Sequence, residues 1–201
     1  MTAVLFPVGH YNGIRPGPDE ESEPSHVIRI GWKQHRLDDD AFAAWVLSHG
    51  LPGTGKGQWT EADVVEQAEL AGLSDAPEHL EKLVTDGLVI RIPDDPAPAT
   101  WFAQTYRMDV MFVGLGNAPD RLDGYGVGIP GIGVAAILDP DCYELWQWGS
   151  VARTLWDSCQ VRATVTAEPS WRPDPEAALV EILGDLRFLL AHGCAYLDVA
   201  G

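Results

Sequence analysis

The amino-acid sequence predicts an α+β fold of two units, each a small antiparallel sheet packed on about three helices. Two observations predict the helices and their duplication: residues 60–92 carry the signals of two short helices followed by a strand, and the end of this pattern recurs at 186–196. A third observation predicts the sheets, because strand-forming runs occur at 27–30, 34–37 and 134–138. The mixture of the two kinds of segment favours α+β over an all-helical bundle.

Both helices of residues 60–92 have local start signals. Thr60 lies three residues before Asp63, and Asp75 lies three residues before Glu78, which is the spacing of a capping box in the second case. Pro77 fits a first helical turn, where its missing N–H costs nothing. Two helices are therefore expected to begin at these caps.

The second of these helices also has a clear end. Leu80, Leu83 and Leu88 recur at helical spacing and predict one buried face. Gly87 stands where a left-handed residue ends a helix cheaply, and residues 88–92 are rich in strand formers. The segment therefore predicts a helix followed by a strand.

The first 50 residues predict an arm, two strands and a helix. Residues 1–25 begin with a short strand-forming segment, Ala3 to Phe6, and become Gly/Pro-rich and acidic, so we expect an N-terminal arm. The strands at 27–30 and 34–37 are expected to turn near Gly31 and Trp32. A helix over 38–49 follows, because acidic residues open it and a glycine follows it.

Two glycine-rich loops imitate nucleotide-binding motifs. Residues 50–57, GLPGTGKG, match the spacing of a phosphate loop, but Gly57 replaces the hydroxyl residue that binds magnesium. The loop also follows a helix, where a phosphate loop needs a strand. Residues 126–131 match G-x-G-x-x-G, but the segment after them predicts a strand instead of a helix. Both are better interpreted as connections.

The C-terminal half repeats the plan of the N-terminal half. We expect strands at 134–138 and 143–148, a helix at 150–159, and a long helix that starts at Asp174. Its end, Leu186 to Tyr196, aligns without a gap on Leu80 to Ile90.

These expectations divide the chain into three parts. The N-terminal arm occupies residues 1–25, the first unit occupies 26–107 and the second occupies 108–201. Each unit has the size of a small domain.

The repeated segment resembles a known DNA-binding fold. The pattern L-x-x-L-V-x-D-G-L-V at 80–89 is similar to the third helix and first wing strand of winged helix-turn-helix domains. This resemblance implies two winged-helix units, with Trp101 to Tyr106 returning as the second wing strand of the first. It also implies DNA reading by a recognition helix at 75–86 or 174–192.

The last third of the chain resembles a second family. Residues 133–159, together with the terminal helix, are similar to the PqqD-like domain, a winged-helix peptide chaperone of pyrroloquinoline quinone biosynthesis and other peptide-modifying systems. There a precursor's leader peptide adds as a strand beside the third strand and rests on the last helix. The resemblance implies a peptide site made of Tyr143, Leu145, Trp146 and Trp148 on a strand, with Leu183, Leu186 and Arg187 opposite. Whether Trp146 and Trp148 are core or surface stays open at this point.

Charge disfavours nucleic acid as a partner. The chain has 30 Asp and Glu residues against 13 Lys and Arg, a net charge of −17, which repels phosphate backbones. A local basic strip of Arg29, Lys33 and Arg36 is the exception. It is either a solvated strand face or a contact for an acidic partner.

The remaining chemistry-bearing residues predict no catalytic or metal centre. The 6 histidines fall singly, and the 3 cysteines share no C-x-x-C spacing, so we expect buried reduced thiols, no metal and no cofactor. No apolar run is long enough to span a bilayer, and the N-terminus is a poor secretory signal. A cytoplasmic protein that does not enter the membrane is expected.

These observations favour a non-catalytic adaptor that binds a peptide or protein segment, in a peptide-modification pathway if the second resemblance holds. A winged-helix transcriptional regulator is the alternative, although Lys82 is the only base between Asp75 and Asp86. An enzyme of unknown type is the second alternative. Exposed sheet edges and 8 tryptophans also favour a homodimer.

Overall fold

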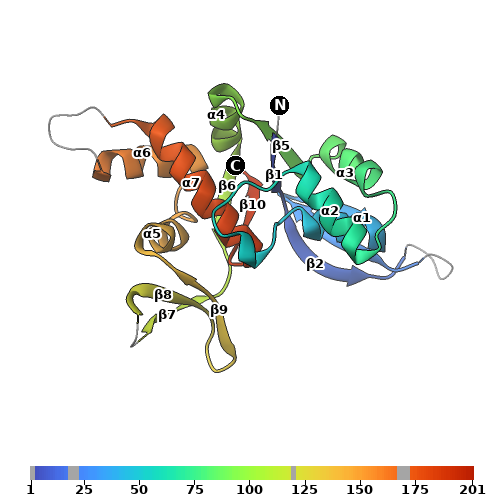
Figure 1. The fold of residues 1–201 in the computed structure, drawn as a ribbon, viewed down its shortest axis with the longest axis horizontal. Helices are drawn as coiled ribbons and strands as arrows, with labels where there is room; N and C mark the ends of the chain where they lie inside the picture. The colour runs from blue at the N-terminus through green and yellow to red at the C-terminus, as the bar shows by residue number, and fades with distance from the viewer. Residues whose placement is uncertain (1–2, 18–22, 119–120, 167–172) are drawn as a thin grey trace.

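The computed structural model describes residues 3–17, 23–118, 121–166 and 173–201. It confirms the α+β fold, because these residues form seven α-helices and four small antiparallel sheets of two or three strands. Figure 1 shows the sheets and helices gathered into an N-terminal and a C-terminal unit, with helix α7 near the middle of the molecule.

The N-terminal unit starts and ends with paired strands. Its elements are β1 (Ala3–Pro7), β2 (His10–Arg15), β3 (Ser25–Ile30), β4 (Lys33–Leu37), α1 (Asp39–Leu47), the short 3₁₀ turn η1 (Pro52–Thr54), α2 (Glu61–Ala71), α3 (Ala76–Thr85) and β5 (Val89–Pro93). Strand β1 pairs antiparallel with β5, while β2, β3 and β4 form a separate antiparallel meander. Residues 3–15, expected in an arm, thus contribute two strands to this unit.

The C-terminal unit repeats this order. After α4 (Pro96–Thr105) come β6 (Tyr106–Val110), β7 (Val113–Ala118), β8 (Arg121–Ile129), β9 (Gly133–Leu138), α5 (Pro140–Trp148), α6 (Leu155–Thr166), α7 (Pro175–Ala191) and β10 (Ala195–Val199). Strand β6 pairs with β10, and β7, β8 and β9 form the second meander. Each unit is thus a strand, a meander, three helices and a strand that returns to the first.

The gap-free alignment of the two units corresponds to the same backbone geometry. The amide of Leu88 donates to the carbonyl of Leu83 at 2.8 Å, and the amide of Cys194 donates to that of Leu189 at 2.8 Å. Gly87 and Gly193 both have positive φ, 74° and 63°, which a glycine adopts without strain after a helix. Helices α3 and α7 therefore end in the same way and lead into equivalent strands.

Equivalent tryptophans fasten the first helix of each unit. Trp45 of α1 donates its indole N–H to the carbonyl of Val8 at 3.3 Å, and Trp146 of α5 donates to the carbonyl of Met111 at 3.1 Å. Both side chains are buried. Each indole thus satisfies a carbonyl just after the unit's opening strand, which a buried polar group requires.

The two units share their interior through strand β1. Its neighbours Leu5 and Phe6 point to opposite faces, as successive strand residues do. Leu5 belongs to the N-terminal core with Leu80 and Leu83, whereas Phe6 belongs to the C-terminal core with Leu186. Because one strand serves both cores, the units pack directly on each other.

Two predicted strands are wrong. Trp101 to Tyr106, expected as a wing strand, is helical up to Thr105, because Asp95 caps α4 through the amide of Ala97 at 2.9 Å. The strand that β5 pairs with is instead β1.

The second wrong strand is Tyr143 to Trp148, which lies in α5. Asp139 caps this helix by accepting from the amide of Cys142 at 2.9 Å, and Pro140 stands in its first turn. The segment Asp139-Pro140-Asp141 starts a helix, where we had expected a turn between strands.

Candidate functional site

The predicted peptide-binding strand is part of helix α5, and its side chains do not share one surface. Leu145 and Trp146 are buried in the C-terminal core, and Tyr143 is half-buried, stacked on Tyr125 with ring centroids 4.4 Å apart. Trp148 is a surface residue with 61% of its area exposed. Because the α5 backbone is bonded within the helix, it offers no free strand edge to a peptide.

The three predicted residues of α7 also lie in different environments. Leu186 is fully buried, and Arg187 is only 4% exposed. Leu183 is half-buried and lines, with Arg187, a cavity at the boundary of the two units. The structure therefore does not bring the seven predicted residues into one site.

An open groove lies between α5 and α6 and includes two of the predicted residues. Its cavity volume is about 400 Å³, which is within the range of ligand pockets. The apolar residues that line it are Leu145, Trp148, Val151, Ala152, Val161, Val165 and Ile182. Among them Val151, Val161 and Val165 are 76%, 64% and 73% exposed. Together with Trp148 they form an apolar surface without a covering element in the described part of the chain.

The charged residues along this groove are mainly acidic. Asp141, Glu144 and Asp157 line it together with a single base, Arg162. Arg162 donates to the carboxylate of the buried Asp185 at 2.7 Å and to the carbonyl of Asp141 at 2.7 Å. Its charge is therefore balanced from within the protein. Asp157 has the exposed Arg153 as an ion-pair partner at 3.7 Å, and Asp141 and Glu144 keep the rim of the groove negative.

The N-terminal unit fills the equivalent position with a side chain. Thr60 caps α2, and Thr154 accepts equivalently from the amide of Asp157 at 3.1 Å. The residue before Thr60 is Trp59, which is buried in the core beside residues of α1 and α2 and donates to the carbonyl of Leu47 at 2.9 Å. The residue before Thr154 is Arg153, whose side chain is 90% exposed. The space near the cap is thus filled in one unit and open in the other.

Lys56 of the glycine-rich loop connects the units. Its Nζ lies 2.6 Å from Asp139 and 2.6 Å from Asp185, which is 2% exposed. Burial alone would lower the pKa of Lys56, but the hydrogen bonds and charges of these two aspartates together raise it above its ordinary value. Because two carboxylates bind the amino group, this loop holds the C-terminal unit in place and has no lysine available for a phosphate.

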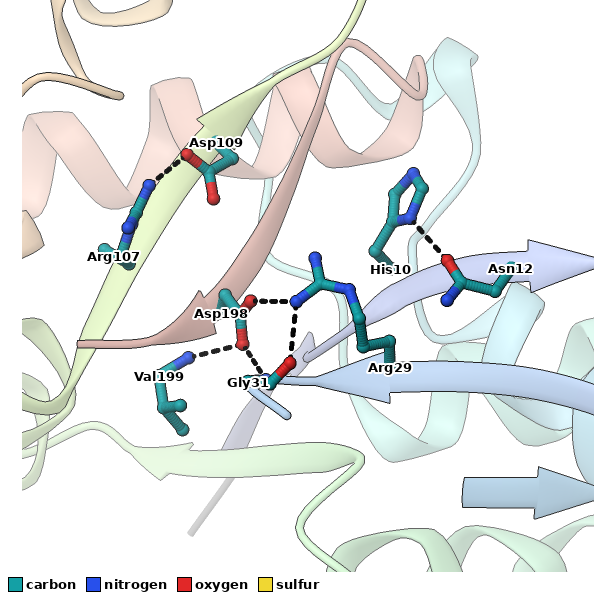
Figure 2. A network of polar contacts seen from close by, with 8 residues as sticks. All are labelled: His10, Asn12, Arg29, Gly31, Arg107, Asp109, Asp198 and Val199. Atoms are coloured by element: carbon teal, nitrogen blue, oxygen red, sulfur yellow. Dashed lines mark hydrogen bonds and ion pairs between the residues drawn. The ribbon is translucent and has the colours of Figure 1, made fainter. Parts of the chain in front are cut away.

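The basic strip is divided between the two faces of its sheet. Arg29 donates to Asp198 at 3.0 Å and to the carbonyl of Gly31 at 2.8 Å, as Figure 2 shows. Arg36 donates to the carbonyl of Pro16 and to Ser25, both at 3.0 Å. Lys33 is exposed and follows the opposite alternation of β4 from Arg36. Arg29 and Arg36 therefore serve internal contacts.

The network around Asp198 is a joint between the units. Besides Arg29, this buried carboxylate accepts from the amide of Gly31 at 2.6 Å and from its neighbour Val199 at 2.9 Å (Figure 2). Its oxygens are thus occupied by groups from both units, which is typical of a structural carboxylate.

The cysteines have the environment of structural thiols. All three are free and buried. Burial raises the pKa of Cys159 to about 12 and that of Cys194 to about 11, and it raises the pKa of Cys142 as well. Such thiols are poor nucleophiles at neutral pH.

The described residues contain no group of three or more His, Cys, Asp and Glu side chains placed to hold a metal ion. No described helix is long and apolar enough to cross a membrane.

No protein-family model, curated protein or solved structure matches this chain. The candidate site therefore rests on the geometry of the α5–α6 groove.

The sequence contains a signal for helix α5, one wall of this groove, although residues 143–148 taken alone favour a strand. The pattern Leu-Asp-x-Asp-x-aromatic-x-x-Trp occurs at 37–45 and again at 138–146, where α1 and α5 start. It would have placed Tyr143 and Trp148 on a helix. The groove residues of α6 have no comparable signal, because their exposure depends on how α6 packs.

Proposed function

We propose that the protein is a non-catalytic adaptor that binds a segment of another protein in the α5–α6 groove. The observation that carries the proposal is the exposed apolar surface of Trp148, Val151, Val161 and Val165 around a cavity of about 400 Å³. Exposed aromatic and aliphatic residues around a pocket are typical of the anchoring centre of a protein interface.

The groove also indicates the chemistry of its partner. Its apolar lining fits aliphatic or aromatic side chains, and Asp141 and Glu144 fit basic residues beside them. The net charge of −17 adds a long-range attraction for a basic segment. A short basic segment with apolar residues at helical spacing combines these features, and side-chain insertion replaces strand addition as its mode of binding.

A peptide titration tests the proposal. The probe is a fluorescein-labelled 15-residue peptide with leucines at helical spacing flanked by lysines, and its control has glutamates in place of the lysines. Fluorescence anisotropy is expected to give a Kd at least about tenfold lower for the lysine peptide. Equal affinities, or no binding to either peptide, would count against the acidic groove.

Trp148→Ala is expected to weaken binding of the lysine peptide at least about tenfold, which is about 1.4 kcal/mol. The loss of an exposed anchor should leave the thermal unfolding midpoint nearly unchanged, since 61% of Trp148 is exposed. Trp101→Ala, on α4 with 54% exposure, is the matched control and should bind as the wild type does. Equal losses in both variants would show that the effect is not specific to the groove.

The transcriptional regulator has less support from the geometry. Helix α3 exposes Glu78, Glu81 and Asp86 beside the single base Lys82, and α7 has eight buried residues. A gel-shift assay with a random duplex library at low salt checks this alternative. Retention of a specific DNA sequence together with no peptide binding would favour the transcriptional regulator over the adaptor.

A further inference from the structure

A second cavity lies at the boundary of the two units, away from the α5–α6 groove. Its volume is about 370 Å³, and β1, β5, α4, α7 and residues 56–58 contribute to its walls. In Figure 1, α4 and the paired strands β1 and β5 lie to the right of the upper part of α7. The apolar residues that line it are Val4, Phe6, Ile92, Ala99, Leu179 and Leu183.

Arg187 is the buried charge of this cavity. It is 4% exposed, and its guanidinium carbon lies 5.3 Å from the centre of the Phe6 ring. One of its terminal nitrogens donates to the carbonyl of Leu5, but its Nε is buried without a hydrogen-bond partner. Among the described residues no carboxylate lies within ion-pair distance of Arg187.

A buried cation without a directly bonded counter-ion is costly, because the interior does not replace the water it has lost. Burial lowers the pKa of Arg187 to about 10, although the more distant charge of Asp63 acts in the opposite direction, so the side chain is still charged at neutral pH. The other base of the cavity, Lys56, is already bound by two aspartates. Arg187 therefore provides the only cationic group in the described lining that has no carboxylate partner.

The acidic residues of the cavity do not cancel this charge. Asp94, Asp95 and Glu176 are exposed, so water screens them far more than it screens a buried guanidinium. Asp95 also caps α4. An anion that enters the apolar part of the cavity gains a partner in a region of low dielectric constant, while water screens the repulsion from the exposed acids.

We propose that this cavity binds a small carboxylate with an apolar body. The carboxylate faces Arg187, and the apolar body packs against Phe6, Leu179 and Leu183. Two sources share this chemistry: a free apolar carboxylic acid and the C-terminal carboxylate of a peptide. The site is independent of the α5–α6 groove and of the function proposed for it.

The test compares ligands that differ only in charge. The probes are N-acetyl-leucine and N-acetyl-leucine amide, measured by isothermal titration calorimetry with the full chain. We expect the acid to bind at least about tenfold more tightly than the amide. A second pair, Gly-Gly-Gly-Leu with a free or an amidated C-terminus, separates the sources. Binding of the free-ended peptide indicates a chain terminus, and binding of N-acetyl-leucine alone indicates a free acid.

Two variants assign the effect to the cavity. Arg187→Met keeps the length and apolar stem of the side chain, and it is expected to abolish the preference for the acid over the amide. Leu183→Phe narrows the cavity and is expected to weaken binding of the acid at least about tenfold while Arg187 stays in place. Trp148→Ala should bind both ligands as the wild type does. Equal affinity for acid and amide in the wild type, no binding of either acid, or a preference that survives Arg187→Met would overturn the proposal.

Discussion

Replacing Asp185 by asparagine is expected to lower the free energy of unfolding by about 3 kcal/mol. This carboxylate is 2% exposed and binds Lys56 at 2.6 Å and Arg162 at 2.7 Å. The isosteric amide keeps the volume but removes the negative charge that balances both cations. We expect the lower end of the range for breaking a buried ion pair, because Lys56 retains Asp139 and Arg162 retains the carbonyl of Asp141.

Urea unfolding followed by circular dichroism measures this loss. Asp141→Asn is the matched control, because Asp141 also binds Arg162 but is exposed and accepts this hydrogen bond through its backbone carbonyl. Its free energy of unfolding should stay within about 0.5 kcal/mol of the wild type. If Asp185→Asn were equally mild, the charge of Asp185 would not be what holds the loop of Lys56 against the C-terminal unit.

Much of the fold could be predicted wherever a local signal decides the structure. The cap at Thr60, the end of α3 at Gly87 and the start of α7 at Asp174 all lie where the sequence placed them. The alignment of 80–90 with 186–196 also corresponds to equivalent elements. The expected capping box at Asp75 does not form, because Asp75 adopts a left-handed conformation with φ of 54° and its side chain accepts no capping hydrogen bond.

The errors arose where a local signal was ambiguous or where a partner was distant in sequence. Tyr143, Trp146 and Trp148 are good strand formers, but the cap at Asp139 decided in favour of a helix. Strand β5 was expected to pair with the segment that follows it. Instead it pairs with β1 from the start of the chain, and that partner cannot be found from periodicity.

The candidate site could be predicted only in part for the same reason. Trp148 and Leu145 were among the expected peptide contacts and do line the α5–α6 groove. Val161 and Val165 were not, because an exposed valine on a helix is recognised as part of a site only when the neighbouring helix is in place. Arg187 was expected to touch a peptide, but it lies outside the α5–α6 groove. It is the buried charge of the cavity at the boundary of the two units.

The two units differ in how they fill the space near the start of their second helix. The N-terminal unit closes its interior near α2 with Trp59 and contributes Lys56 and Arg29 to contacts with the other unit. The C-terminal unit has an exposed Arg153 at the position of Trp59 and keeps its groove open. We therefore expect the N-terminal unit to support the C-terminal one and the binding of a partner to depend on α5 and α6.

Lowering the pH is expected to reduce the free energy of unfolding, because burial favours the neutral form of His49 in the N-terminal unit. Burial lowers the pKa of His49 to about 4, although the carbonyls of Trp45 and Val46 act in the opposite direction. The ordinary histidine pKa of about 6.5 applies in the unfolded chain, so between these values the unfolded state binds more protons than the folded state. The stabilisation that neutral His49 provides is complete well above pH 6.5 and decreases as the pH falls towards 4. By pH 5 the loss in the free energy of unfolding is about 2 kcal/mol.

The pH dependence of urea unfolding tests this expectation for the wild type and for His49→Gln. Glutamine can still donate to the carbonyl of Trp45, which His49 contacts at 3.0 Å, but it cannot gain a proton. Between pH 7.5 and 5 the wild type should lose about 2 kcal/mol more than His49→Gln. Because Arg187 lies close enough to His49 to lower its pKa further, protonation also places a second cation beside the boundary of the units. Parallel pH profiles for the two proteins would mean that His49 accepts a proton in the folded state as easily as in the unfolded chain.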